Sequence, residues 1–312
     1  MRISRGLPTV ISPDSREEAE HLADLIQQNR ATYRTLLIEA GALLFRGFGV
    51  KSVADFQQVS CAGTPHLVSY TGGGSPRKRV DGNVYTSTEY PRHQSIPMHC
   101  EETYFPRIPK NIWFFCAVPP DCGGQTPLGC MRRFLGLLDQ DLVEEFCTRG
   151  IRYIYNLHSG NGFGRGWRDA FMSDDRDWVT AWLEERKVEY RWRGDGGLHM
   201  DLPGRVLRKH SETGETIWGN QVVNWHIDAL PVETSSAIRR LYPSANEYPK
   251  HVTFGDGAPI PKSKINYVME SLASFEVTFD WRPGDVLWCD NERVAHGRRP
   301  FSGSRRILVA LS

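Results

Sequence analysis

The feature of this sequence that most constrains its fold is a series of short apolar runs separated by turn-forming pieces such as "PPDCGGQTP", "SETGE" and "RPGD". This pattern is typical of an antiparallel sandwich or barrel and not of alternating βα units. We therefore expect one mainly β domain over residues 1–312, with helices packed outside the sheets. The expected strands lie within 41–50, 111–118, 150–157, 215–223, 274–281, 285–290 and 305–311.

Helical patterns are fewer than strand patterns. Ser15 and Glu18 have the spacing of a capping box, and apolar residues follow them at helical spacing up to Ile26. Two further helices are expected within 132–150 and 174–187.

One long segment carries neither pattern. Residues 66–97 are rich in Gly, Ser, Pro and charged side chains, which predicts irregular structure. Loops of this length are uncommon unless they bind or cover something, so we expect a lid or insert here, with a disordered insertion as the alternative.

Composition narrows the class of protein. Hydrophobic residues make up 40% and charged residues 24% of the chain, which is the balance of a soluble globular protein. The net charge of +1 favours neither a nucleic-acid nor a membrane partner, so a small molecule or a protein is expected. Without a signal peptide or a run of about 20 apolar residues, the protein is expected to be cytoplasmic. Seven scattered cysteines without a Cys-x-x-Cys pair indicate neither a disulfide framework nor a thiolate zinc site.

Histidine–acid pairs are the candidate metal ligands. With ten histidines and 37 acidic residues, about one His-x-acid match is expected by chance. The chain contains four, namely His99/Glu101, His199/Asp201, His210/Glu212 and His226/Asp228. The second and third lie in turn-like segments, whereas His226/Asp228 could end a strand and is the strongest rival. For any single histidine, a hydrogen-bonded structural imidazole is the alternative.

The C-terminal region supplies what His99 and Glu101 lack. An iron site with two histidines and one carboxylate needs a third ligand from a distant strand, and His296 follows the expected strand at 285–290. Arg305 and Arg306 open the next strand, and a guanidinium there could pair with the distal carboxylate of a chelating 2-oxoacid such as 2-oxoglutarate. Because successive strand residues face opposite sides, only one of the two arginines can face the iron.

These residues resemble the taurine dioxygenase-like (TauD/TfdA) family of iron(II)/2-oxoglutarate oxygenases, and within it the SyrP-like branch. The resemblance rests on pieces that occur in family order: "ALLFRGF", "NVYTSTEYP", "IPMHCEETYFPRIPKNIWFFC", "GGQTPL", "TGETIWGNQ" and "DNERVAHGRRPFSGSRRILVAL". It implies a double-stranded β-helix, or jelly roll, which agrees with the expected strands.

The resemblance also implies a set of site residues. His99, Glu101 and His296 would bind iron(II), while Arg305 and Thr126 would contact 2-oxoglutarate, with Arg306 as the second candidate for its carboxylate. Halogenating relatives lack the carboxylate ligand, so the presence of Glu101 argues against halogenation.

The implied function uses iron(II), 2-oxoglutarate and O2 to hydroxylate an unactivated C–H bond. The expected substrate is an amino acid or a derivative, free or bound to a peptidyl carrier protein, in natural-product biosynthesis. The candidate substrate residues are Asn83, Tyr85, Glu89 and Arg298, although Tyr85 could be a packed loop aromatic and Arg298 a solvated cation. The same enzyme class acting on a small sulfonate or carboxylate, or giving desaturation or epoxidation, is one alternative. A non-catalytic metal-binding jelly-roll protein is another.

Overall fold

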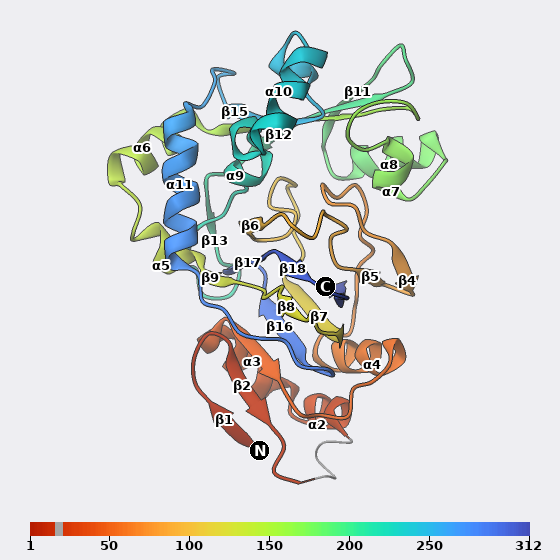
Figure 1. Cartoon of the computed structure of the whole chain (residues 1–312), viewed down its shortest axis with the longest axis vertical. Helices are drawn as coiled ribbons and strands as arrows, with labels where there is room; N and C mark the ends of the chain where they lie inside the picture. Colours follow the sequence, from red (N-terminus) through yellow and green to blue (C-terminus); the bar gives the residue numbers. More distant parts are fainter. Residues whose placement is uncertain (16–20) are drawn as a thin grey trace.

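The computed structural model describes residues 1–15 and 21–312. Figure 1 shows the N-terminal elements at one end of the long axis, residues 167–192 and 232–254 at the other, and the C-terminal strands between them. The expected capping box includes Glu18, which lies outside the described residues. The helix expected after it is present as α2 (Leu22–Gln28).

The larger sheet contains eight strands, and all neighbours in it are antiparallel except β2 and β3. In spatial order they are β1 (Arg2–Ser4), β2 (Thr9–Ser12), β3 (Ala42–Phe45), β16 (Val286–Asp290), β7 (Asn111–Val118), β19 (Arg306–Leu311), β5 (Val84–Thr86) and β4 (Arg79–Asp81). The strands expected within 41–50, 111–118, 285–290 and 305–311 are therefore confirmed.

Strand β7 shows why its sequence is continuously apolar. Phe114 packs in a cluster with residues of a separate three-stranded sheet, which we call the smaller sheet, while Trp113 and Phe115 pack on the opposite face. That opposite face is covered by α2, α3 (Arg30–Ala40) and α4 (Val53–Gly63). Because successive strand side chains alternate between faces, a strand covered on both sides needs apolar residues at every position.

The smaller sheet lies against this core and contains β6 (Ile96–His99), β17 (Val294–Arg298) and β9 (Leu128–Cys130). Two short ribbons accompany it, β18 (Phe301–Ser302) with β8 (Cys122–Gly123), and β13 (Leu207–Lys209) with β14 (Thr216–Trp218). The chain is thus mainly β with flanking helices, as expected.

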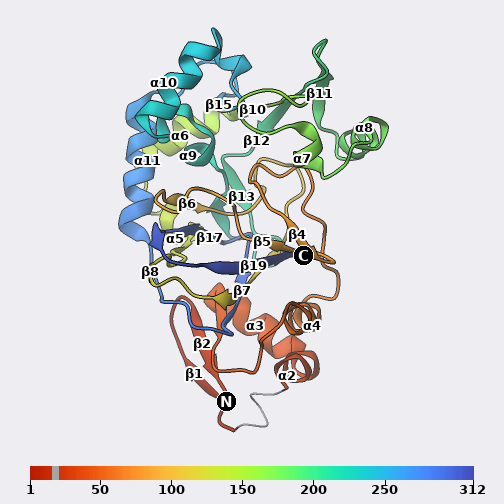
Figure 2. The same ribbon diagram turned by 45° about the vertical axis from the view of Figure 1, so that its right-hand side comes forward.

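The middle of the chain forms a four-stranded sheet with its own hydrophobic core. Its strands are β11 (Glu189–Trp192), β12 (Leu198–Gly204), β10 (Ile151–Leu157) and β15 (Lys250–Phe254). The helices around it are α5 (Met131–Leu135), α6 (Gln140–Arg149), α7 (Trp167–Phe171), α8 (Arg176–Glu185), α9 (Val222–Trp225), α10 (Val232–Leu241) and α11 (Lys262–Phe275). Figure 2 shows α11 beside β6, which it contacts.

Two expected strands are wrong in whole or in part. Within 215–223 only β14 is extended, because the Asn220 side chain accepts from the Val222 N–H at 3.1 Å and α9 begins there. Within 274–281, α11 continues to Phe275, and Val277 forms a single bridge with Leu128.

The expectation that turns rather than helices separate the later strands is also wrong. Helices α10 and α11 lie between β14 and β16. The buried residues Ile265, Val268 and Leu272 have the helical spacing that signals α11. Among the described residues, no helix is long and apolar enough to cross a membrane.

Candidate active site

Two histidines face each other across the smaller sheet. His99 ends β6, and in the antiparallel pairing with β17 its direct partner is His296. Their ring centroids are 4.8 Å apart, and Phe114 of the larger sheet packs edge-on against His296. Residues 197 positions apart in the sequence are therefore held side by side by strand register, because directly opposite side chains on one sheet face are neighbours.

Glu101 reaches the same point from the turn after β6. Its backbone N–H donates to the Asn291 side chain at 2.7 Å, and the Asn291 amide donates in turn to the carbonyls of Glu101 and Pro109. Ligand atoms of His99, Glu101 and His296 all lie within 4.8 Å of one another. The three residues singled out in the sequence are thus brought together.

The imidazoles are held in the neutral form that a metal requires. Burial lowers the pKa of His99 and holds the pKa of His296 well below its usual value. The Nδ1 atom of His99 is bonded to the Pro97 carbonyl at 2.8 Å, which directs the lone pair of Nε2 into the cluster. Two neutral imidazoles and one carboxylate match the donor set of a mononuclear iron(II) site with open positions.

Arg77 is a site residue that the sequence did not reveal. It comes from the segment 66–97, where the expectation of irregular structure is wrong in part, because β4, β5 and the start of β6 lie within it. The Arg77 Nη2 atom donates to Glu101 Oε2. Both side chains are 2% exposed. The Arg77 Nε and Nη1 atoms are buried without a hydrogen-bond partner in the described structure, so this guanidinium has two donors available for an anionic ligand.

A small cavity lies on one side of the cluster and is lined by Arg305, Thr126, Arg77, His99 and His296, among others. The Thr126 hydroxyl accepts from Trp281 Nε1 at 3.0 Å and from Arg305 Nη2 at 3.4 Å. The unpartnered donors of Arg77 together with the Arg305 guanidinium suit a dicarboxylate, so the chain fits 2-oxoglutarate as well as iron. Arg306 is exposed at the start of β19, because the strand alternation turns it away from Arg305.

A larger cavity of about 490 Å³ also borders the cluster. Its lining includes His99 and Glu101, residues of the segment 66–97, and Lys250 of β15. His99 borders both cavities. The small cavity measures only about 30 Å³, whereas the larger one has the size of a substrate chamber.

The candidate substrate residues lie elsewhere than expected. Asn83 hydrogen-bonds Leu67 and Ser69, Tyr85 is fully buried in the core, and Glu89 forms an ion pair with Lys78 at 3.2 Å. Arg298 borders the small cavity, but its guanidinium donates to the carbonyls of residues 90, 91 and 94. None of these four lines the larger cavity. Asn83 and Glu89 lie outside strands, whereas Tyr85 lies in β5 and Arg298 in β17, and residue spacing does not encode which face of these strands meets the cavity.

The rival histidine–acid pairs have structural roles. His226 accepts the Asp228 N–H at 3.2 Å, and Asp228 pairs with Arg239. In the other pair, which lies on β12, His199 is hydrogen-bonded to Asn156 and Asp201 accepts from Arg152.

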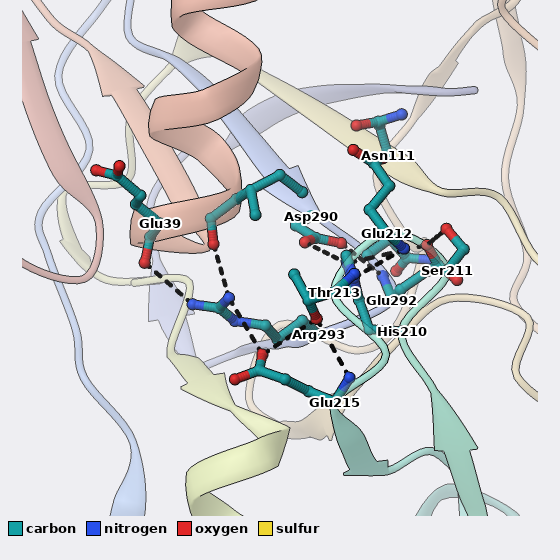
Figure 3. A network of polar contacts seen from close by, with 12 residues as sticks. Glu39, Asn111, His210, Ser211, Glu212, Thr213, Glu215, Asp290, Glu292 and Arg293 are labelled. Atoms are coloured by element: carbon teal, nitrogen blue, oxygen red, sulfur yellow. Dashed lines mark hydrogen bonds and ion pairs between the residues drawn. The ribbon is translucent and has the colours of Figure 1, made fainter.

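His210 lies within metal-binding reach of Asp290 and Glu292. However, its Nε2 is bonded to Asp290 at 2.8 Å, while its Nδ1 accepts from the backbone N–H groups of residues 212 and 213 (Figure 3). Both ring nitrogens of His210 are engaged in hydrogen bonds, so this cluster is a structural hydrogen-bond network and not a metal site.

The sequence matches a known protein family and individual members of it. The family model described as taurine catabolism dioxygenase TauD, TfdA family, matches residues 5–311. The dapdiamide synthesis protein DdaC of Enterobacter agglomerans is 33% identical over 276 residues, covering 88% of this chain and 83% of that protein. The clavaminate synthase-like protein At3g21360 of Arabidopsis thaliana is 31% identical over 323 residues, covering 99% and 94%.

Solved structures share the fold at low sequence identity. An asparagine oxygenase in complex with Fe(II), 2S,3S-3-hydroxyasparagine and succinate superposes with a TM-score of 0.60 at 11% identity, covering 97% of this chain and 92% of that one. PvcB, an Fe, alpha-ketoglutarate dependent oxygenase from an isonitrile synthetic pathway, gives 0.53 at 15% identity, covering 97% and 84%.

Proposed function

The chain belongs to the TauD, TfdA dioxygenase family, and from this premise we propose that it hydroxylates an unactivated C–H bond of an amino acid or amino-acid derivative. It is an iron(II)/2-oxoglutarate-dependent dioxygenase with a jelly-roll fold, and its cofactors are iron(II), 2-oxoglutarate and O2. Membership of this enzyme class argues against the alternative of a non-catalytic metal-binding jelly-roll protein. The observation that carries the proposal is the meeting of His99, Glu101 and His296 at the wall of two neighbouring cavities.

In this proposal, His99, Glu101 and His296 hold the iron. When bound, iron(II) and 2-oxoglutarate together activate O2 to attack a C–H bond, which is chemistry that no side chain supplies. The His99–Pro97 hydrogen bond fixes the orientation of one imidazole, and Asn291 fixes the turn that carries Glu101. The protein therefore contributes preorganised placement.

Arg305 and Thr126 would hold 2-oxoglutarate in the small cavity. Burial lowers the pKa of Arg305 to about 10, so its guanidinium stays charged at neutral pH. Trp281 donates to Thr126 and thereby fixes the hydroxyl that Arg305 also contacts. The exposure of Arg306 supports Arg305 as the carboxylate partner.

The segment 66–97 would serve as the lid of the larger cavity within a single domain. Arg165 donates to the carbonyls of Gly73 and Ser75 at 2.5 and 2.9 Å, and Arg298 holds the carbonyls of residues 90, 91 and 94. These bonds support a covering segment fixed at both ends, which would exclude water from the chamber.

Substrate class rests on the relatives. The names of DdaC and of the asparagine oxygenase complex, and the isonitrile pathway of PvcB, support an amino-acid-type substrate in natural-product biosynthesis. A small sulfonate or carboxylate substrate, and desaturation or epoxidation, are less favoured outcomes of the same chemistry. Presentation on a carrier protein, a cytoplasmic location and membership of the SyrP-like branch stay predictions.

The test is anaerobic addition of iron(II) and 2-oxoglutarate to the apo-protein, watching for the visible charge-transfer band of the chelated cosubstrate. We expect the band in the wild type and its loss in His99→Ala and Glu101→Ala. At modest 2-oxoglutarate concentration it should also be lost in Arg305→Ala but kept in the matched control Arg306→Ala. A band and full 2-oxoglutarate turnover in Glu101→Ala would refute the ligand assignment.

A further inference from the structure

The larger cavity has an unbalanced charge. Its charged lining residues, apart from His99, are Glu101, Asp228 and Lys250. Glu101 pairs with Arg77, and Asp228 pairs with Arg239 at 2.7 Å. The Lys250 ammonium has neither a hydrogen bond nor a salt bridge to any residue in the described parts of the chain. The chamber therefore offers an unpaired cation but no unpaired carboxylate among the described lining residues.

The framework fixes Lys250 at the cavity wall. It is the first residue of β15, where it pairs with Tyr155 of β10. Its Nζ lies 4.9 Å from the centroid of the Trp225 ring, and that ring packs against Tyr104 and Tyr153 with centroids 4.7 and 5.1 Å away. An aromatic face attracts an ammonium but does not replace its hydration as an anion can.

Burial lowers the pKa of Lys250 to about 8. The ammonium is thus still mainly protonated at neutral pH, and the Glu101 carboxylate favours this charged form of the partly buried side chain. A partly buried cation that no carboxylate contacts directly is costly for a fold, and such groups are concentrated at sites that bind ligands.

The remaining lining shows what else a ligand would meet. The Gln221 amide donates to the Cys100 carbonyl, and the Asn224 amide donates to the Pro97 carbonyl, so each amide has one of its two N–H groups engaged. Val223, Leu230 and Met269 add apolar surface. The chamber therefore suits an apolar body that ends in an anion.

We propose that the Lys250 ammonium pairs with a carboxylate of the substrate, so that the enzyme acts on a free amino-acid-type carboxylic acid and not on an aminoacyl thioester. This inference rests on the proposed function and narrows its substrate class. A thioester carbonyl is uncharged and would leave the cation without a partner. Because both acids of the chamber are already paired, a free amino group on the substrate is not required, and N-acylated acids fit the charge balance.

The binding test uses probes of defined chemistry. The protein is loaded anaerobically with iron(II) and saturating 2-oxoglutarate, and straight-chain carboxylates from butanoate to octanoate and N-acetyl-L-leucine are compared with their primary amides by calorimetry and melting temperature. We expect the acids to bind about tenfold or more tightly than the amides. Lys250→Met, which keeps the length of the side chain over Trp225, should remove this preference. The matched control Lys262→Met, at the exposed start of α11, should keep it.

Three results would overturn the inference: equal binding of acids and amides to the wild type, an acid preference that survives in Lys250→Met, or no acid binding to protein that has taken up 2-oxoglutarate. Faster succinate release with an aminoacyl-pantetheine thioester than with the corresponding free acid would also overturn it. Failure of the wild type to bind iron and 2-oxoglutarate would instead count against the proposed function, so the two failures are distinguishable.

Discussion

Replacing Arg77 by Met should destabilise the metal-free protein and increase the stabilisation that it gains from metal. The substitution removes the guanidinium that pairs with Glu101, and both side chains are 2% exposed. Removal of one partner from a buried ion pair costs about 3–5 kcal/mol, because the remaining charge is uncompensated. With an unfolding entropy of about 2.1 cal/mol/K per residue over 312 residues, the melting temperature should fall by about 5–8 °C.

Metal should recover much of this loss. A divalent cation bound by His99, Glu101 and His296 supplies positive charge beside the carboxylate that Arg77 no longer neutralises. The increase in melting temperature on adding iron(II) anaerobically should therefore be several degrees larger in Arg77→Met than in the wild type. The assay is thermal unfolding followed with iron(II) and with a chelator. Arg79→Met, which changes an exposed arginine in the same segment, is the matched control and should behave as the wild type.

A double variant provides a second test of the role of the Glu101 charge. In Arg77→Met/Glu101→Gln the uncompensated charge is gone, so the metal-free double variant should be at least as stable as Arg77→Met. An equal metal-dependent shift in the wild type and Arg77→Met would refute the electrostatic argument. A double variant less stable than Arg77→Met would do the same.

Two further predictions concern histidines outside the site. The rings of His226 and His251 lie 4.9 Å apart, and burial, together with mutual repulsion at His251, lowers their pKa values to about 4 and about 3. The unfolded chain takes up these protons near pH 6.5, so stability is complete above that pH and should fall by about 1.4 kcal/mol per pH unit for each histidine as pH drops toward 4. Urea unfolding at several pH values should show a shallower loss in His251→Leu, and an unchanged slope would contradict this. His210→Phe leaves the Asp290 Oδ2 atom and the backbone N–H groups of residues 212 and 213 without their His210 partner, which should cost about 2–5 kcal/mol while leaving the bound iron per chain unchanged. Loss of iron in folded His210→Phe protein would show that the cluster around His210 is a metal site.

The sequence was most informative where side-chain direction follows from strand geometry. Residues 112–118 are continuously apolar because both faces of β7 are covered, and this strand was predicted with its observed bounds, Asn111–Val118. Neither β6, which ends at His99, nor β17, which contains His296, was among the expected strands. Alternation alone required that Arg305 and Arg306 face opposite sides. The choice between the two arginines needed the structure, because spacing does not say which face of a strand meets the iron site.

The sequence by itself determined the β-rich class, the three residues that meet as a metal cluster and the arginine pair, since these depend on local periodicity and on family motifs. Tertiary structure decided which charges remain unpaired. Arg77 contacts Glu101 from an irregular segment, Tyr85 turns into the core, and Lys250 reaches the chamber wall from another sheet. The path of an irregular segment and the balance of charges around a cavity depend on contacts between residues far apart in the chain, and no local pattern specifies them.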